Sequence, residues 1–296
     1  MSSNLRGILW MGATGLLFVA VTGIVRHLGT DMSPVQAAFI RYALGTVLLI
    51  PVFIRMERIL GSPQILGLHA VRGIIHGIGV MLWFFAMARI PIAEVTALGF
   101  TAPIFTTLGA ALFLGEKLYF YRIGAVLMGF GGALVVLQPG FQEINLGSIA
   151  QLTAAPIFSC SFLIAKRLTN VESSGAIVAY LSIFVTLTLL PPAIYFWRTP
   201  TWEEFGWLFA TASCATAGHY TLAQAFRAAD ITLTQPVQFL QLVWATILGL
   251  MLFGEEPEVW TWVGGGMIVA SATFIAHREG IRRRSAARNE NGTKPL

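Results

Sequence analysis

Ten long apolar segments run along this chain, and they constrain its fold more than any other feature. A helix needs roughly 20 apolar residues to cross the hydrocarbon core of a bilayer, and each segment comes near that length. A transmembrane β-barrel would instead show segments of about 10 residues with alternating polarity. We therefore predict an all-α integral membrane protein with ten transmembrane helices. The predicted spans are residues 5–28, 34–54, 66–88, 93–114, 120–137, 147–165, 175–197, 205–226, 231–253 and 259–276.

The charge content of the chain agrees with a lipid environment. Of its 296 residues, 56% are hydrophobic and only 11% are charged, whereas a soluble domain carries roughly 25% charged residues. The net charge of +5 does not indicate nucleic-acid binding, because the basic residues lie in short gaps between apolar segments and in the last stretch, 278–296. Cys160 and Cys214 both fall inside apolar segments, so we expect neither a disulfide framework, nor a metal site, nor a cofactor.

The distribution of basic residues also predicts the orientation. If both termini are cytoplasmic, fifteen of the 19 lysines and arginines fall on the inner side. Three arginines fall on the outer side (Arg26, Arg89 and Arg198), and Arg41 lies within a span. The positive-inside rule therefore favours a multi-pass protein of the cytoplasmic (inner) membrane, with cytoplasmic N- and C-termini. Residues 278–296 would form a basic cytoplasmic tail.

The two halves of the chain resemble each other at a spacing of 139 to 140 residues. We expect a first repeat over residues 1–140 and a second over 141–277, each with five spans. Because five is an odd number, the second repeat must enter the membrane inverted. Such inverted repeats characterise secondary transporters, in which one half rocks against the other around a site near the midplane. The matched pairs are Gly7 with Gly147, Phe18 with Phe158, Ile24 with Ile164, Arg26 with Lys166, Leu28 with Leu168, Ala86 with Ala225, Ile92 with Ile231, Gly115 with Gly254 and Glu116 with Glu255.

Matching motifs in the two halves give the chain a resemblance to a known family. The motifs are ARIPIAEVTALGFTAP at 88–103, FLGE at 113–116, ADITLTQP at 229–236 and LFGE at 252–255. With these motifs in order, and with Arg41 and Arg72 at usual positions, the chain resembles the EamA branch of the drug/metabolite transporter superfamily over nearly its whole length. The resemblance implies a ten-helix bundle, a central cavity lined by both halves, and alternating-access transport without ATP. Since the family includes exporters of amino acids and toxic metabolites and importers of compounds such as riboflavin and S-adenosylmethionine, neither substrate nor direction carries over.

We therefore predict a secondary active transporter of a small organic metabolite: an amino acid, a vitamin such as riboflavin, or a nucleoside-type compound. A membrane-embedded enzyme is the main alternative. His76 and His219 could meet, but no Asp, Glu or Cys is placed to complete a catalytic site. A structural membrane protein would not require an inverted repeat, and a channel would show a selectivity-filter motif, which is missing here. The sequence does not predict an oligomeric state.

Polar groups inside the spans are candidates for substrate binding, because they are costly in a bilayer. In the segment 66–88, His76 and Trp83 fall on one helical stripe with Arg72. We expect His76 and Trp83 to face the substrate, and Arg72 to mark the cytoplasmic boundary and extend its charge to the surface. Ser159 and Ser161, in the segment 147–165, either contact the ligand or bond to their own helix.

A second group of candidates lies in the last third of the chain. Gln235, Gln238, Gln241 and Trp244 follow at steps of three, so neighbouring members share a flank of the helix. We expect Gln235 to bond to another helix and the others to contact the substrate. A cavity with Trp83, Trp244 and Tyr220 would suit a planar or aromatic ligand, although ordinary aromatic packing explains these residues equally well. The predicted substrate-binding residues are His76, Trp83, Tyr220, Gln238, Gln241 and Trp244.

Four charged residues have further predicted roles. Arg41 lies within a span and should balance either a carboxylate of the substrate or Glu94. Glu94 is the best candidate for proton coupling, and its alternative role is favourable placement at a helix N-terminus. Glu116 and Glu255 end paired helices in the turns, where we expect a structural role that includes latching a gate.

Overall fold

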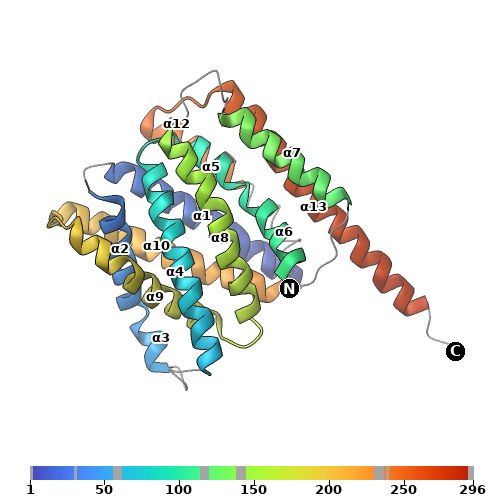
Figure 1. Ribbon diagram of the computed structural model, residues 1–296, viewed down its shortest axis with the longest axis horizontal. Coiled ribbons are helices and arrows are strands. Elements are labelled where there is room, and N and C mark those ends of the chain that lie inside the picture. Colours follow the sequence, from blue (N-terminus) through green and yellow to red (C-terminus); the bar gives the residue numbers. More distant parts are fainter. Residues whose placement is uncertain are drawn as a thin grey trace.

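The structure is a computed structural model that describes residues 3–29, 32–55, 62–113, 120–137, 145–229, 237 and 240–292. The described secondary structure is entirely helical, and the helices lie side by side in one bundle (Figure 1). The helices are α1 (Ser3–Leu28), α2 (Pro34–Leu48), α3 (Ile50–Arg55), α4 (Pro63–Met87), α5 (Ile92–Gly99), α6 (Ala102–Phe113), α7 (Phe120–Leu137), α8 (Leu146–Leu168), α9 (Ser174–Tyr195), α10 (Trp202–Ala228), α12 (Leu240–Phe253) and α13 (Val259–Gly292). The prediction of an all-α integral membrane protein is confirmed.

Where the structure describes them, the helices follow the predicted spans, with two breaks. Residues 231–236, 238 and 239 of the predicted span 231–253 lie outside the described residues. Within the described residues, four helices are individually long and apolar enough to cross a membrane: α1, α4, α8 and α9. The predicted spans 34–54 and 93–114 are each divided into two helices, α2 with α3 and α5 with α6. Pro51 and Pro103 are the second residues of α3 and α6, and a proline there ends the preceding hydrogen-bond ladder while fitting the first turn of the next helix. The last helix, α13, continues past residue 276 and projects from the bundle (Figure 1).

Helix contacts repeat between the two halves of the chain. The first span of each half packs against the third span of the other half: α1 packs against α10, and α8 packs against α4. α2 packs against α9 and α7 against α13, and each of these pairs joins corresponding helices. Thr46 on α2 and Thr186 on α9 are 140 residues apart, and their hydroxyl oxygens lie 3.4 Å from each other. This arrangement is that of two repeats related by a two-fold axis between α2 and α9.

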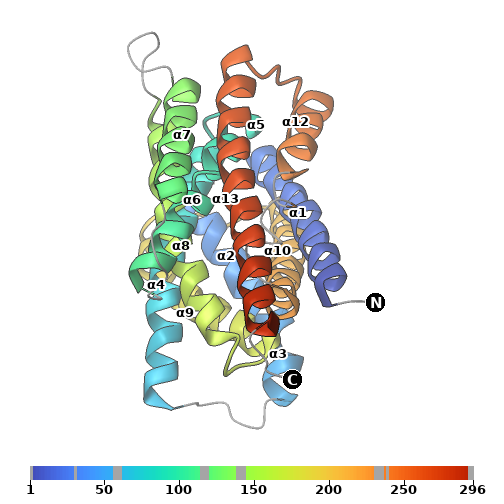
Figure 2. The same ribbon diagram turned by 90° about the vertical axis from the view of Figure 1, so that its right-hand side faces the viewer.

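The contacts at one end of the bundle show that the halves are inverted. Arg26, near the end of α1, donates from Nη1 to the carbonyl of Met87 at the end of α4 (3.3 Å). Gly147, at the start of α8, packs so closely on Ile90 that a Cβ would lie 2.9 Å from its side chain. α8 therefore begins where α1 ends, so the first helices of the two halves run in opposite directions. We call this end of the bundle the Arg26 end; both chain termini lie toward the opposite, terminal end (Figure 2).

The faces of α4 show how the chain distributes polarity. Its buried face carries Arg72 and His76, whereas Ile74 and Ile78 are exposed. Apolar side chains outside and polar ones inside are what a helix bundle in lipid requires. The expectation that Arg72 extends to the surface is wrong, because only 3% of this residue is exposed. Its Nη1 donates instead to the carbonyl of Ile177 on α9, at 3.1 Å.

Candidate functional site

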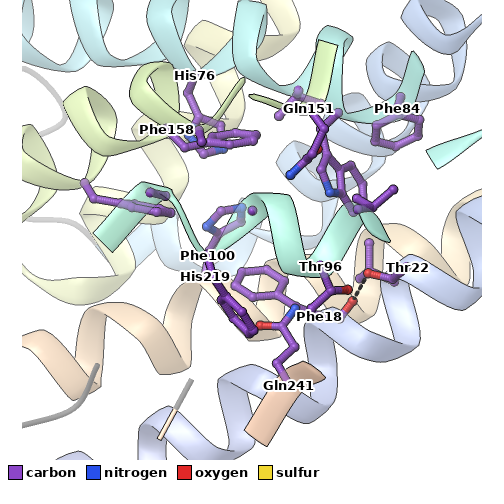
Figure 3. A pocket seen from close by; sticks show the side chains of 18 of the residues that line it. Phe18, Thr22, His76, Phe84, Thr96, Phe100, Gln151, Phe158, His219 and Gln241 are labelled. Atoms are coloured by element: carbon purple, nitrogen blue, oxygen red, sulfur yellow. Dashed lines mark hydrogen bonds between the residues drawn. The ribbon is translucent and has the colours of Figure 1, made fainter. Parts of the chain in front are cut away.

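A cavity of about 190 Å³ lies between the two halves of the described bundle (Figure 3). Helices α1, α2, α4, α5 and α6 of the first half and α8, α10 and α12 of the second half line it. The break between α5 and α6 lies at its wall, where Phe100 contributes its ring. Its lining residues are Phe18, Val21, Thr22, Arg41, Tyr42, His76, Val80, Trp83, Phe84, Val95, Thr96, Gly99, Phe100, Ala102, Thr106, Gln151, Ala155, Phe158, Phe162, His219 and Gln241.

The structure brings some of the predicted site residues together in this cavity and places others elsewhere. His76, Trp83, Gln241 and Arg41 line it. Tyr220, Trp244 and Glu94 do not, and Gln238 lies outside the described residues. Helix geometry explains two of these placements. Tyr220 is one residue beyond His219, so it points about 100° away from the cavity, and Trp244 is rotated about 60° from Gln241.

Tyr220 belongs to a second hollow on the protein. Its hydroxyl accepts a hydrogen bond from Nε2 of Gln224 (3.0 Å), and Ser174 on α9 donates to Oε1 of the same amide (3.2 Å). The hollow is also lined by Val52 of α3 and Arg227 of α10. Its lining therefore does not overlap with that of the central cavity.

Two histidines meet inside the cavity. The rings of His76 and His219 are 5.2 Å apart between centroids, and Nδ1 of His76 is hydrogen-bonded to the hydroxyl of Ser161 at 2.9 Å. Phe158 packs edge-on against His76, and Phe18 packs in the same way against His219, at 5.0 and 5.2 Å between centroids. Phe18 and Phe158 are a matched pair of the repeat, so each half contributes an aromatic ring to the other's histidine. Among the described residues, no group of three or more His, Cys, Asp or Glu could hold a metal ion.

Arg41 is buried at the cavity wall and lies over an aromatic ring. Its guanidinium carbon is 3.8 Å from the centroid of the Tyr42 ring, a favourable cation–π arrangement. No ion pair joins Arg41 to Glu94, although both lie in the described part of the chain. The carboxylate of Glu94 instead accepts a hydrogen bond from the hydroxyl of Ser148, at 2.6 Å. Glu94 is also in the first turn of α5, where the helix dipole favours an acid.

The sequence analysis did not select several residues that line the cavity. Gln151 on α8 reaches in from the side opposite Gln241 (Figure 3). The rule that selects polar residues within a span would have found Gln151, but no sequence signal marks Phe100 as a wall residue. Ser159 does not line the cavity, because its hydroxyl bonds to main-chain carbonyls, including that of Ala102 at 2.7 Å.

Glu255 joins the two halves at the Arg26 end. One of its carboxylate oxygens lies 2.8 Å from Nη2 of Arg26, and the other accepts a hydrogen bond from the backbone N–H of Ile92, also at 2.8 Å. It thus ties the turn after α12 to α1 and to the start of α5. Its sequence counterpart, Glu116, lies outside the described residues.

The cations matched by the repeat make equivalent backbone contacts. Arg26 donates to the carbonyl of Met87 at 3.3 Å, and Lys166 donates to the carbonyl of Phe226 at 3.1 Å. Met87 and Phe226 are themselves 139 residues apart, which is the repeat spacing. The symmetry between the halves therefore extends to individual side chains at both ends of the bundle.

Comparisons with known proteins agree with this architecture. The sequence profile of a family described as "EamA-like transporter family" matches residues 5–138 and again 145–276. A riboflavin transporter of Vibrio cholerae is 31% identical over 281 residues, which cover 93% of this chain and 94% of that protein. An S-adenosylmethionine uptake transporter of Rickettsia bellii is 27% identical over 254 residues, which cover 86% of this chain and 87% of that protein. A solved structure described as the crystal structure of a protein matches with a TM-score of 0.65 and 18% identity over 92% of this chain and 97% of its own, a likeness of fold.

Proposed function

This chain belongs to the EamA-like transporter family, and we propose that it is a secondary active transporter that works by alternating access. The family and its transporter relatives identify a small-metabolite transporter of the membrane rather than an enzyme. The proposed substrate is an amino acid, a vitamin such as riboflavin, or a nucleoside-type compound. The observation that carries the mechanism is the cavity between two inverted halves, because rocking of one half against the other would expose it to each side in turn.

The orientation in the membrane is part of the proposal. We place the chain in the cytoplasmic (inner) membrane with both termini in the cytoplasm, so that the terminal end faces inward and the Arg26 end outward. The excess of lysine and arginine at the terminal end supports this orientation. The proposed repeats are residues 1–140 and 141–277, and residues 278–296 form the basic tail.

Glu255 is suited to hold the Arg26 end closed. Its carboxylate forms an ion pair with Arg26 and accepts a hydrogen bond from the backbone N–H of Ile92. Both partners belong to the first half, while Glu255 belongs to the second. Opening of this end by relative motion of the halves would separate these groups. We therefore assign Glu255 as the latch of the closed outer gate, which must be released in each transport cycle.

Flux into liposomes that contain the purified protein tests the proposed function. We expect saturable movement of at least one labelled compound from a panel of riboflavin, amino acids and nucleosides under an imposed proton gradient. Liposomes without protein give the background rate. If a correctly folded protein moves none of these classes above that background, secondary transport of such metabolites is contradicted.

The substitution Glu94→Gln tests proton coupling. If Glu94 carries the coupled proton, the neutral variant should lose the dependence of the transport rate on pH, because it has no proton to release. The measurement is the initial flux between about pH 5 and 8, the range over which a perturbed carboxyl group could titrate. The matched control is Glu203→Gln at the exposed start of α10. An unchanged pH profile in Glu94→Gln would contradict proton coupling by Glu94. Its remaining role would then be the favourable placement of an acid at the helix N-terminus.

A further inference from the structure

The cavity carries a positive charge that no carboxylate of the described residues neutralises. Arg41 is the one formally charged side chain among the described lining residues, and only 6% of it is exposed. No carboxylate of the described residues forms an ion pair with it, and Glu94 is bonded to Ser148. A buried charge without a partner is strongly destabilising in a low-dielectric interior. An anionic group on a bound ligand would supply the missing partner.

A second cation, which pairs with no carboxylate among the residues that the structure describes, lies behind this wall. Arg72 precedes His76 by one helical turn on α4 and is buried. Its Nη1 bonds to the carbonyl of Ile177, and its Nε has no hydrogen-bond partner among the described residues. A carbonyl oxygen satisfies a hydrogen bond but carries no net negative charge. The two arginines therefore make the potential at this side of the cavity positive.

Two buried hydrogen-bonding groups lie beside Arg41. Nδ1 of His219 has no partner within the described part of the chain, and the hydroxyl of Tyr42 has only the guanidinium of Arg41 beside it, so its O–H remains free to donate. Tyr42 and His76 have ring centroids 6.2 Å apart, and His219 follows at 5.2 Å from His76. A hydroxyl and an imidazole N–H are both donors, and the guanidinium adds several more. Carboxylate and phosphate oxygens match such a set, because charge-assisted hydrogen bonds are stronger than neutral ones.

The remaining walls of the cavity are aromatic. Trp83, Phe84, Phe100 and Phe158 line it, together with Phe162, whose ring is nearly parallel to that of Phe158. Such walls favour a flat, conjugated ligand. The cavity, at about 190 Å³, is smaller than the roughly 300–1,000 Å³ typical of pockets for drug-sized ligands. One or two fused rings with a short charged substituent suit this space.

We infer that the substrate is an aromatic organic anion, whose carboxylate or phosphate binds at Arg41 with Tyr42 and His219 while its ring lies against the aromatic walls. This inference rests on the proposed function, since it names the substrate class of the same cavity. Riboflavin has no acidic substituent, so the inference separates this chain from a relative named for that vitamin. The anion would bind to a cavity in which the positive charge of Arg41 is already present.

Binding of matched acids and amides tests the inference without any need for transport. The probes are indole-3-acetate with indole-3-acetamide, and nicotinate with nicotinamide, which keep the ring and exchange a carboxylate for a neutral amide. Isothermal titration calorimetry at pH 7 on the purified protein in detergent should show that the acid binds about tenfold more tightly, or better, in at least one pair. Equal affinity of acid and amide, or binding of no acid in either pair, overturns the inference.

Variants of Arg41 assign the preference to this residue. In Arg41→Gln the ratio of acid to amide affinity should fall to below about twofold, while Arg41→Lys should retain most of it. The control Arg89→Gln removes an exposed arginine that stacks on Phe85 outside the cavity, and it should leave the ratio unchanged. A ratio that survives in a folded Arg41→Gln protein contradicts the assignment. If Arg41→Gln does not fold, loss of the ratio in the folded Arg41→Lys protein contradicts it.

The two proposals fail separately. A protein that binds the acids preferentially but moves neither the panel compounds nor the labelled acids themselves in liposomes would overturn transport and leave the anion site in place. A protein that transports a neutral compound and shows no preference for acids would overturn the anion site alone.

Discussion

Replacing Gly73 with alanine is expected to destabilise the protein by about 1–3 kcal/mol, the usual cost of overpacking a tight interior. Gly73 lies where α4 crosses α9, and a Cβ there would be 2.2 Å from Cβ of Phe184 and 3.0 Å from its carbonyl carbon. A flexible side-chain tip could move aside, but the backbone of a packed helix cannot. α4 and α9 would therefore have to separate, which would also displace His76 one turn further along α4.

A thermal-unfolding measurement on the purified protein in detergent checks this expectation, with Gly67→Ala as the matched control. Gly67 is exposed on the same helix and has no atom within 4 Å of the added Cβ. Alanine has the higher helix propensity by about 1 kcal/mol, so the control should be neutral or slightly more stable. A melting temperature for Gly73→Ala equal to that of Gly67→Ala would show that α4 and α9 are not packed as described.

Replacing Gln241 with alanine should lower kcat/KM for transport roughly tenfold or more while leaving membrane expression unchanged. The amide of Gln241 enters the cavity from α12, opposite Gln151 (Figure 3). A bound ligand replaces its hydrogen bonds to water with hydrogen bonds to these two amides. In Gln241→Ala one amide is missing, so a polar group of the ligand is buried without a partner, which costs about 1–3 kcal/mol. Initial flux over a range of substrate concentrations, compared at equal protein content, gives the ratio.

Gln224→Ala provides the matched control for this prediction. It removes the same amide from α10, but Gln224 bonds to Tyr220 and Ser174 at the second hollow and does not line the central cavity. Flux through Gln224→Ala should stay within about twofold of the unaltered protein, since no contact with the cavity is lost. Equal losses in both variants, or no loss in Gln241→Ala, would place the substrate elsewhere.

The fold was predictable from the sequence because one physical rule dominates it. Lipid requires long apolar helices, and these appear directly as apolar segments. The inverted repeat followed from the odd number of spans per half together with the matched residues. The breaks before Pro51 and Pro103 were harder to foresee, because a proline inside a span either kinks a helix or ends it, and the choice depends on neighbouring helices.

The site was only partly predictable, since its described residues come from eight helices that sequence spacing does not relate to one another. Spacing along α4 correctly placed His76 and Trp83 on one stripe, but it could not show that Arg72 finds a carbonyl on α9. Tyr220 and Gln224 do share a face, and that face belongs to the second hollow. A periodic pattern identifies residues that are neighbours on one helix. Which other helix faces them is decided by tertiary packing.

Side-specific labelling of one cysteine in the cavity tests the central claim most directly. Thr96 lines the cavity from α5, so a Thr96→Cys protein in which Cys160 and Cys214 are replaced by serine carries a single reporter thiol. A membrane-impermeant maleimide is added to one side or the other of sealed vesicles that hold the protein in one orientation. Alternating access predicts that the thiol reacts from both sides and that a transported compound slows both reactions. Reaction from one side only, under every gradient and ligand condition, would contradict it.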